Sequence, residues 1–219
     1  MIEGSTIAKR APETVFIVDD DTAICEGLCN LLESVGLTAE HFPSAENFLQ
    51  QWNGARAGCL VLDVRLPGMT GVEFQEKMQE RGIEIPIIFM TAHGDIPMVR
   101  KVMKAGAVEF LTKPFAIQEL LNAIDQAFAR DHDRRMEETI LNSIQSCVDT
   151  LTVREREVMA MVTSGLLNKQ IAAELNLSEI TVKLHRSRVM EKMEAGSLAE
   201  LVKLCERIKR SSQAKGKPH

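Results

Sequence analysis

Four short apolar runs in the first half of the chain end on polar side chains, and this pattern constrains the fold more than any other. Asp19 and Asp20 follow the first run, Asp63 closes the second, Thr91 closes the third and Lys113 follows the fourth. Such runs are typical of strands buried on both faces of a parallel sheet. Parallel α/β sheets collect ligand and catalytic groups at the carboxyl ends of their strands. We therefore expect these side chains to converge on one metal ion and one phosphoryl group.

Segments with helical spacing of apolar residues lie between the apolar runs. The expected strands cover residues 14–18, 38–42, 58–63, 85–90 and 108–111. The expected helices cover residues 22–35, 44–53, 71–81, 96–105 and 116–130. Strands that alternate with helices predict an α/β domain with a doubly wound, five-stranded parallel sheet over residues 1–130.

The rest of the chain shows no strand signal. Residues 131–149 are polar, lack Gly and Pro, and carry spaced apolar residues, which predicts a helical linker. Thr152 and Glu155 form the capping-box pattern T-x-x-E at the start of a helix. Further helices are expected over 168–175, 178–193 and 197–209. Residues 150–219 therefore form an all-α domain, followed at its end by a tail that we expect to be disordered.

Charge is divided unevenly along the chain. Residues 1–130 carry a net charge of −7, residues 131–149 carry −3 and residues 150–219 carry +5. A basic C-terminal part makes nucleic acid a candidate partner.

No apolar run approaches the roughly 20 residues that span a bilayer, and the N-terminal segment lacks a signal-peptide core. We expect a cytoplasmic protein with no membrane partner.

The chain has five cysteines, an odd number, and no C-x-x-C pair. Cys25 and Cys29 lie four residues apart on an expected helix, a spacing that would suit a metal ion. No second ligand pair accompanies them. We therefore interpret the cysteines as reduced packing residues.

The acidic residues indicate phosphoryl chemistry. Clustered carboxylates repel one another, so a cation is expected, and hard oxygen ligands favour Mg²⁺. The alternative for the triplet that ends at Asp21 is a helix cap. Asp63 can act as a nucleophile towards phosphorus and form an aspartyl phosphate. Lys113 would bind one phosphoryl oxygen and the Thr91 hydroxyl another.

The motifs FIVDDD, LVLDVRLPGMTG, IIFMTAHGD and EFLTKPF resemble the receiver domain of two-component response regulators. The run TAHGDIPM followed by MKAGA resembles the FixJ-like branch. The resemblance covers residues 14 to about 130 and implies a flavodoxin-like fold. It implies these roles: Asp19 and Asp20 as metal ligands, the backbone carbonyl of Arg65 as a further ligand, Asp63 as phosphoacceptor and metal ligand, Thr91 and Phe110 as switch residues, and Lys113 as the phosphate-binding lysine before a cis peptide bond to Pro114.

Residues 152–193 predict a helix-turn-helix. Asn176 can end one helix in the left-handed conformation, and Ser178 can cap the next. Within 178–193, helical spacing puts one apolar face towards the core and leaves Lys183, Leu184, Ser187 and Arg188 on the other. A solvated basic face is the plain alternative.

On DNA, Lys183 can reach guanine acceptors, Ser187 can reach either kind of group and Leu184 can reach a thymine methyl. Four other residues are expected to contact phosphates and set the register: Asn168, Lys169, Thr181 and Arg186.

The run from Leu151 to Met193 also resembles the LuxR/NarL-type DNA-binding domain. The resemblance covers about 150–210. It implies that the last helix, with Leu198, Leu201, Val202 and Leu204, serves dimerisation. Core packing alone can explain part of that stripe.

Together the two resemblances imply a FixJ-like transcriptional response regulator and not an enzyme. Its partners would be a sensor histidine kinase, promoter DNA, a second copy of the chain on activation, and RNA polymerase. One alternative is a Mg²⁺-dependent phosphohydrolase of the haloacid-dehalogenase class. That class places an Asp two residues after the nucleophile, where this chain has Arg65. The other alternative is a DNA-binding protein that ignores phosphorylation.

Overall fold

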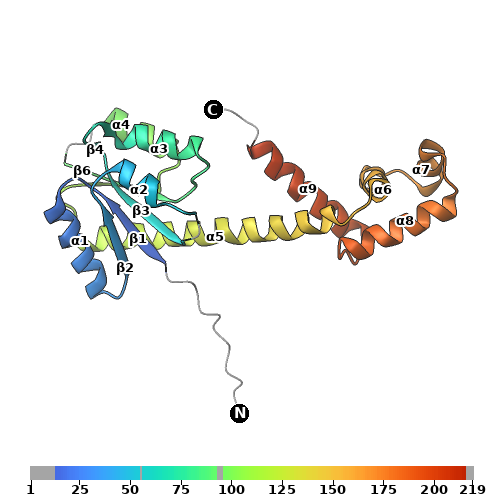
Figure 1. Cartoon of the computed structure of the whole chain (residues 1–219), viewed down its shortest axis with the longest axis horizontal. Coiled ribbons are helices and arrows are strands. Elements are labelled where there is room, and N and C mark those ends of the chain that lie inside the picture. The colour runs from blue at the N-terminus through green and yellow to red at the C-terminus, as the bar shows by residue number, and fades with distance from the viewer. Residues whose placement is uncertain (1–12, 55, 93–95, 216–219) are drawn as a thin grey trace, which may run out of the picture. The chain divides into compact units, whose positions relative to one another are not determined.

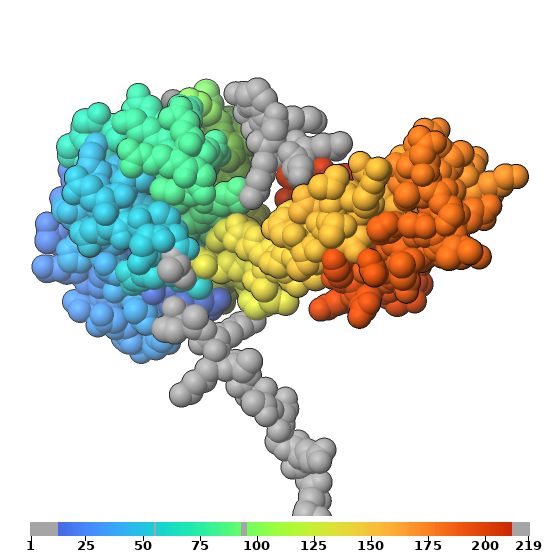
Figure 2. Space-filling model, turned by 45° about the vertical axis from the view of Figure 1, so that its right-hand side comes forward, coloured from blue at the N-terminus to red at the C-terminus, as the bar shows by residue number. Residues whose placement is uncertain are grey.

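The computed structural model describes residues 13–54, 56–92 and 96–215. The chain divides into two compact units, which we call the N-terminal unit (Met1–Arg134) and the C-terminal unit (Arg135–His219) (Figure 1). Figure 2 shows the first in blue to green and the second in yellow to red. The start of the chain and the end of the tail, both interpreted above, lie outside the described residues. Among the helices that are described, none is long and apolar enough to cross a membrane.

The N-terminal unit contains the predicted five-stranded parallel sheet, in the order β2-β1-β3-β6-β7. Its strands are β1 (Thr14–Val18), β2 (Thr38–Phe42), β3 (Gly58–Asp63), β6 (Ile87–Thr91) and β7 (Glu109–Thr112). Its helices are α1 (Thr22–Ser34), α2 (Ala45–Gln51), α3 (Gly71–Glu80), α4 (Ile96–Lys104) and the first part of α5 (Ile117–Asp149). Counted without the hairpin described below, this is the flavodoxin-like order of a doubly wound sheet. The predicted fold class is confirmed.

Alternation along each strand sends side chains to two separate cores, one on each face of the sheet. Phe16, Leu60 and Phe89 point to the face covered by α2, α3 and α4. Ile17 and Val61 point to the face covered by α1 and α5. Because both faces are covered, β1, β3 and β6 are buried along their whole length, whereas the edge strand β2 carries Glu40 and His41.

One small element was not predicted. β4 (Arg65–Leu66) and β5 (Met69–Thr70) form an antiparallel hairpin directly after β3. Two-residue strands are too short to show an alternating pattern, so the sequence gives no periodic signal for them.

The C-terminal unit is helical. Its elements are the second part of α5, α6 (Val153–Thr163), α7 (Asn168–Leu175), α8 (Glu179–Lys192) and α9 (Leu198–Lys215). The helix expected over 116–130 and the linker expected over 131–149 form one continuous helix, because no Gly or Pro interrupts the chain between them. Helix α9 runs to Lys215 rather than to residue 209, so the first part of the expected tail is helical.

The capping signals read from the sequence are present. Thr152 and Glu155 form a capping box at α6. Asn176 adopts the left-handed conformation, with φ of 53°, at the end of α7. Ser178 accepts a hydrogen bond from the backbone N–H of Thr181 at the start of α8. These caps fix the α7–α8 turn, which sets how α8 projects from the unit.

Candidate functional site

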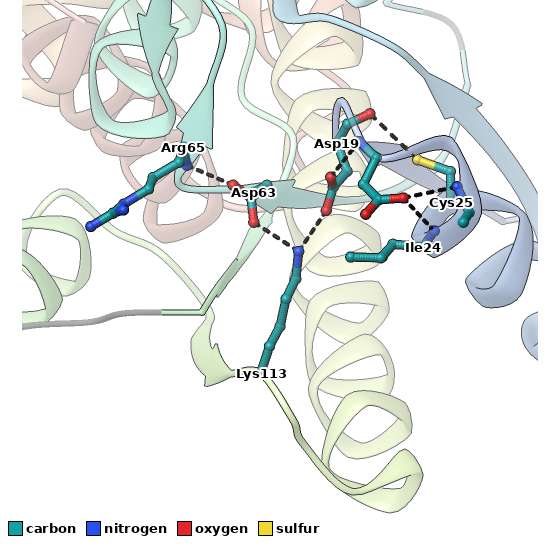
Figure 3. Close-up of polar contacts among 8 residues, drawn as sticks. Asp19, Ile24, Cys25, Asp63, Arg65 and Lys113 are labelled. Atoms are coloured by element: carbon teal, nitrogen blue, oxygen red, sulfur yellow. Dashed lines mark hydrogen bonds and ion pairs between the residues drawn. The ribbon is translucent and has the colours of Figure 1, made fainter.

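Lys113 joins two carboxylates at the carboxyl end of the sheet. Its Nζ lies 2.6 Å from Asp19 Oδ2 and 2.9 Å from Asp63 Oδ1 (Figure 3). Asp19 directly follows β1, Asp63 is the last residue of β3, and these strands pair in parallel with Val18 opposite Leu62. The structure therefore brings together three of the residues that the sequence placed at strand ends. We call Asp19, Asp63 and Lys113 the acidic cluster.

Backbone N–H groups hold both carboxylates in place. Asp63 Oδ2 accepts a hydrogen bond from the N–H of Arg65 at 2.7 Å, and Asp19 Oδ1 accepts one from the N–H of Asp21 at 2.9 Å. Asp19 and Asp63 are only 3% and 7% exposed. Each carboxylate thus has one oxygen bound to backbone and the other bound to Lys113.

Lys113 carries the positive charge of the cluster. Burial lowers its pKa, but hydrogen bonds to Asp19 and Asp63 and attraction by both carboxylates outweigh this effect, so the pKa lies above its usual value. The ammonium group therefore stays charged at neutral pH. Removing it would leave two buried carboxylates without a cation, which is strongly unfavourable.

Thr91 is joined to Lys113 by a backbone hydrogen bond. It is the last residue of β6, fully buried, and its carbonyl accepts a hydrogen bond from the backbone N–H of Lys113 at 2.7 Å. Phe110 lies on β7 opposite Phe89 and packs, partly buried, against the core on the α2–α3–α4 face. The peptide bond from Lys113 to Pro114 is cis. The two predicted switch residues thus lie on neighbouring strands, Thr91 on β6 and Phe110 on β7.

The three residues of the acidic triplet, Asp19, Asp20 and Asp21, lie in different surroundings. Asp19 enters the cluster, whereas Asp21 caps α1 by accepting hydrogen bonds from the N–H groups of Ala23 and Ile24. Asp20 is exposed to solvent. The helix-cap interpretation of the triplet is therefore right for Asp21 and does not apply to Asp19.

The donor set of the site fits a hard cation. In the described part of the chain, no three His, Cys, Asp or Glu side chains are grouped closely enough to hold a metal ion. Two carboxylates against one ammonium nevertheless leave the acidic cluster net negative, and the exposed Asp20 follows Asp19 in the sequence. All of these donors are oxygens, the ligand type that Mg²⁺ prefers.

The cysteines of the N-terminal unit pack in or against the core on the α1–α5 face. Cys25 and Cys59 are buried in the core on the α1–α5 face, and burial raises the pKa of the Cys59 thiol. All five cysteines are free. Cys25 Sγ lies 3.5 Å from the carbonyl of Asp19 and donates to it.

Gly71 supports the site, and the sequence reasoning gave it no role. Its N–H donates to the carbonyl of Val64 at 2.8 Å. A Cβ at this position would lie 2.8 Å from the backbone oxygen of Asp63 and 3.0 Å from Phe89 Cε1. Only glycine lets α3 begin this close to the end of β3. Gly71 is the last residue of the motif LVLDVRLPGMTG, which was the sequence signal available for it.

Five exposed residues on α7 and α8, three of them basic, form a surface that could face DNA. Val182, Val189 and Met193 are buried in the C-terminal unit, as the helical spacing predicted. The residues assigned to base or phosphate contact that lie exposed are Lys169, Lys183, Leu184, Ser187 and Arg188. We call these five residues the basic face.

The other expected phosphate contacts are half-buried. Arg186 Nη1 donates to Asn168 Oδ1 at 3.1 Å, which ties α8 to α7. The Thr181 hydroxyl lies 2.8 Å from the Ser178 hydroxyl. Sequence reasoning overlooked Ile180, whose 79% exposure puts an apolar side chain at the start of α8, the end of the helix that enters DNA first in helix-turn-helix proteins.

The apolar stripe of α9 is split between core and surface. Leu201 is fully buried with Ile144, Val189 and Met193, so its side chain belongs to the core of the unit and is not available to a second copy. Leu198 is exposed and Val202 is half-buried. The packing explanation of the stripe therefore holds for Leu201.

Known proteins resemble the chain over both units. Residues 15–125 match the response regulator receiver domain, and residues 149–205 match the bacterial regulatory proteins of the luxR family. Nodulation protein W of Bradyrhizobium diazoefficiens is 50% identical over 206 residues, which cover 94% of this chain and 91% of that protein. The transcriptional regulatory protein FixJ of the same organism is 40% identical, with coverage of 88% and 94%.

A solved structure agrees with these matches. The response regulator StyR aligns with a TM-score of 0.78 and 48% identity, over 90% of this chain and all of that one. Receiver and luxR-type matches occur in the order that the sequence motifs predicted. The chain belongs to the two-component response regulators that join a receiver domain to a LuxR-type DNA-binding domain, a family of transcriptional regulators.

Proposed function

We propose that Asp63 accepts a phosphoryl group from a sensor histidine kinase and that this controls DNA binding by the C-terminal unit. The observation that carries the proposal is the position of Asp63, held by Lys113 on one oxygen and by the Arg65 N–H on the other. In the reaction, a carboxylate oxygen of Asp63 forms a bond to phosphorus as the bond from phosphorus to the kinase imidazole breaks. The imidazole leaves and takes up a proton.

Chain residues around Asp63 have distinct parts in this step. Asp19, Asp20, Asp63 and the backbone carbonyl of Arg65 would hold Mg²⁺. When bound, the ion neutralises charge on the phosphoryl oxygens. Lys113 already contacts the reacting carboxylate. Its ammonium group can therefore exchange this hydrogen bond for one to a phosphoryl oxygen with little movement.

The response then passes to the sheet edge. Thr91 offers a hydroxyl that can donate to a phosphoryl oxygen, and Phe110 on the next strand is only partly buried and can change position with it. We propose that this rearrangement promotes dimerisation, with Leu198 and Val202 of α9 contributing. Two copies of α8 would then bind promoter DNA through the basic face, with Asn168, Thr181 and Arg186 at phosphates, and recruit RNA polymerase.

Mass spectrometry of the intact chain tests the phosphorylation site. With acetyl phosphate and Mg²⁺, the unmodified sequence should gain one phosphoryl group, and Asp63→Asn should gain none. Asp21→Asn is the matched control, because Asn still caps a helix and Asp21 lies outside the cluster. Modification that persists in Asp63→Asn would show that another residue is the acceptor.

A titration of each variant with Mg²⁺ tests the metal ligands. Asp20→Ala should weaken Mg²⁺ binding and, with it, the rate of phosphorylation by acetyl phosphate. Asp21→Asn should change neither. If Asp20→Ala binds Mg²⁺ as tightly as the natural sequence, the ligands lie elsewhere.

A further inference from the structure

Ile180 is a large apolar side chain that is exposed in the first turn of α8. Its exposed fraction is 79%. The helix begins at Glu179, and the hydroxyl of Ser178 caps it by accepting a hydrogen bond from the N–H of Thr181 at 3.1 Å. The cap therefore fixes the backbone that carries Ile180. A single exposed aliphatic side chain is ordinary on a protein surface and by itself indicates no function.

Ile180 lies on the same face of α8 as the residues proposed to contact bases. Lys183, Leu184 and Ser187 follow it at i+3, i+4 and i+7, the spacing that aligns side chains along one face of a helix. All three are exposed, whereas Val182 is fully buried in the core of the C-terminal unit. In helix-turn-helix proteins the N-terminal residues of the recognition helix contact base edges. A helix that enters the major groove through this face therefore brings Ile180 to the bases.

An aliphatic side chain has a narrow choice of contacts on DNA. It has no hydrogen-bond donor for a phosphate oxygen and cannot pair with the donors and acceptors of the base edges. The base edges in the major groove present one large apolar group, the C5 methyl of thymine. Contact between this methyl and an aliphatic side chain removes apolar surface of both from water, which is favourable. Leu184, 50% exposed and one turn further along α8, has the same chemistry.

We propose, on the basis of the DNA binding proposed above, that Ile180 is a specificity-determining residue that contacts the C5 methyl of a thymine. Ile180 and Leu184 are separated by about 6 Å along the helix axis, and successive base pairs are about 3.4 Å apart. The thymine contacted by Ile180 is therefore about one or two base pairs from the one contacted by Leu184. The two side chains together select a pair of nearby thymines in the DNA site.

Replacing thymine by deoxyuridine tests the contact, because it removes the C5 methyl and keeps the base pair. A duplex would be selected from a random-sequence pool with the full-length chain, Mg²⁺ and beryllofluoride, and its thymines would be replaced one at a time. At the position contacted by Ile180, the replacement should weaken binding by the natural sequence about fourfold. The same replacement should leave the affinity of Ile180→Ala unchanged. Ile180→Val, which keeps a branched aliphatic side chain, should retain most of the effect.

Val153→Ala is the matched control. Val153 is also an aliphatic residue at the start of a helix, α6, and is 75% exposed. This control should keep the natural response to every replacement, and Leu184→Ala should lose the response at a different thymine. If no replacement distinguishes Ile180→Ala from the natural sequence, the proposal is overturned while α8 remains docked on DNA, and Ile180 is left to contact a protein partner. If the selection enriches no sequence at all, the proposed DNA binding fails together with it.

Discussion

The acidic cluster contains its own partner groups, whereas the basic face of α7 and α8 would find its partners only on DNA. In the cluster, two buried carboxylates and an ammonium group already contact one another, and backbone N–H groups fix both acids. On the basic face, Lys183 and Arg188 project into solvent and would find their partners only on DNA. The first site is therefore coupled to the stability of its unit, and the second is not. Substitutions should separate these two behaviours.

The largest effect on stability is expected from Lys113→Met. Removing the ammonium leaves Asp19 and Asp63 buried and unpaired, which should destabilise the N-terminal unit by about 3–5 kcal/mol at pH 7. Denaturant unfolding of the natural sequence and the variant at pH 7 measures this loss. The double variant Lys113→Met, Asp63→Asn should recover part of the loss; if it recovers none, the cluster is not the cause.

The second-largest effect on stability is expected from Gly71→Ala. The added Cβ would meet the backbone of Asp63, which cannot move without shifting β3, so we expect a loss of about 1–3 kcal/mol in the N-terminal unit. Gly27→Ala is the control, because nothing lies within 4 Å of its Cβ and the position is helical. It should be neutral or stabilising by up to about 1 kcal/mol. Equal loss in both variants would contradict the close approach.

The basic face should respond in affinity and not in stability. Lys183→Ala should change which base is preferred, at about 1–3 kcal/mol for its position, if the contact to guanine is bidentate. Lys169→Ala on α7 should weaken all sequences alike and reduce the salt slope by about one counterion. Affinities for a selected site and its single-base variants at several salt concentrations distinguish the two. A uniform loss in Lys183→Ala would make it a phosphate contact.

A pH-dependent difference is expected within the C-terminal unit itself. The hydrogen bond from Lys192, at 2.7 Å, together with the N–H of Thr152, lowers the pKa of Glu155 to about 2. This stabilisation is complete above the unfolded value of about 4.3 and is lost as pH falls towards 2. Glu155→Gln should therefore cost about 1–2 kcal/mol at pH 7 and much less near pH 2. Glu157→Gln, at an exposed pair, should show no such dependence.

Much of the acidic cluster could be predicted because parallel strands bring their carboxyl ends together. Asp19, Asp63 and Lys113 each end a strand or follow one, so topology alone makes them neighbours. The sequence could not show that Asp20 is exposed while Asp21 caps α1, because consecutive residues that leave a strand turn in different directions. It also gave no reason for Gly71, whose role depends on how closely α3 approaches β3.

Less of the C-terminal unit could be predicted, because it depends on which helix covers which. The stripe of α9 appeared suited to dimerisation as a whole, but Leu201 packs against Ile144 of α5. That contact joins residues far apart in the sequence and has no local signal. Likewise, the exposed position of Ile180 follows from how the α7–α8 turn projects α8, not from its own neighbours in the chain.

The measurement that tests the central claim most directly is DNA affinity with and without beryllofluoride, which mimics the phosphoryl group on an aspartate. The full-length chain, Asp63→Asn and the control Asp21→Asn would be titrated onto the same selected DNA site in the presence of Mg²⁺. We predict that beryllofluoride tightens DNA binding by the natural sequence and by Asp21→Asn but leaves Asp63→Asn unchanged. An equal response in Asp63→Asn, or no response in any of the three, would contradict control of the basic face by Asp63.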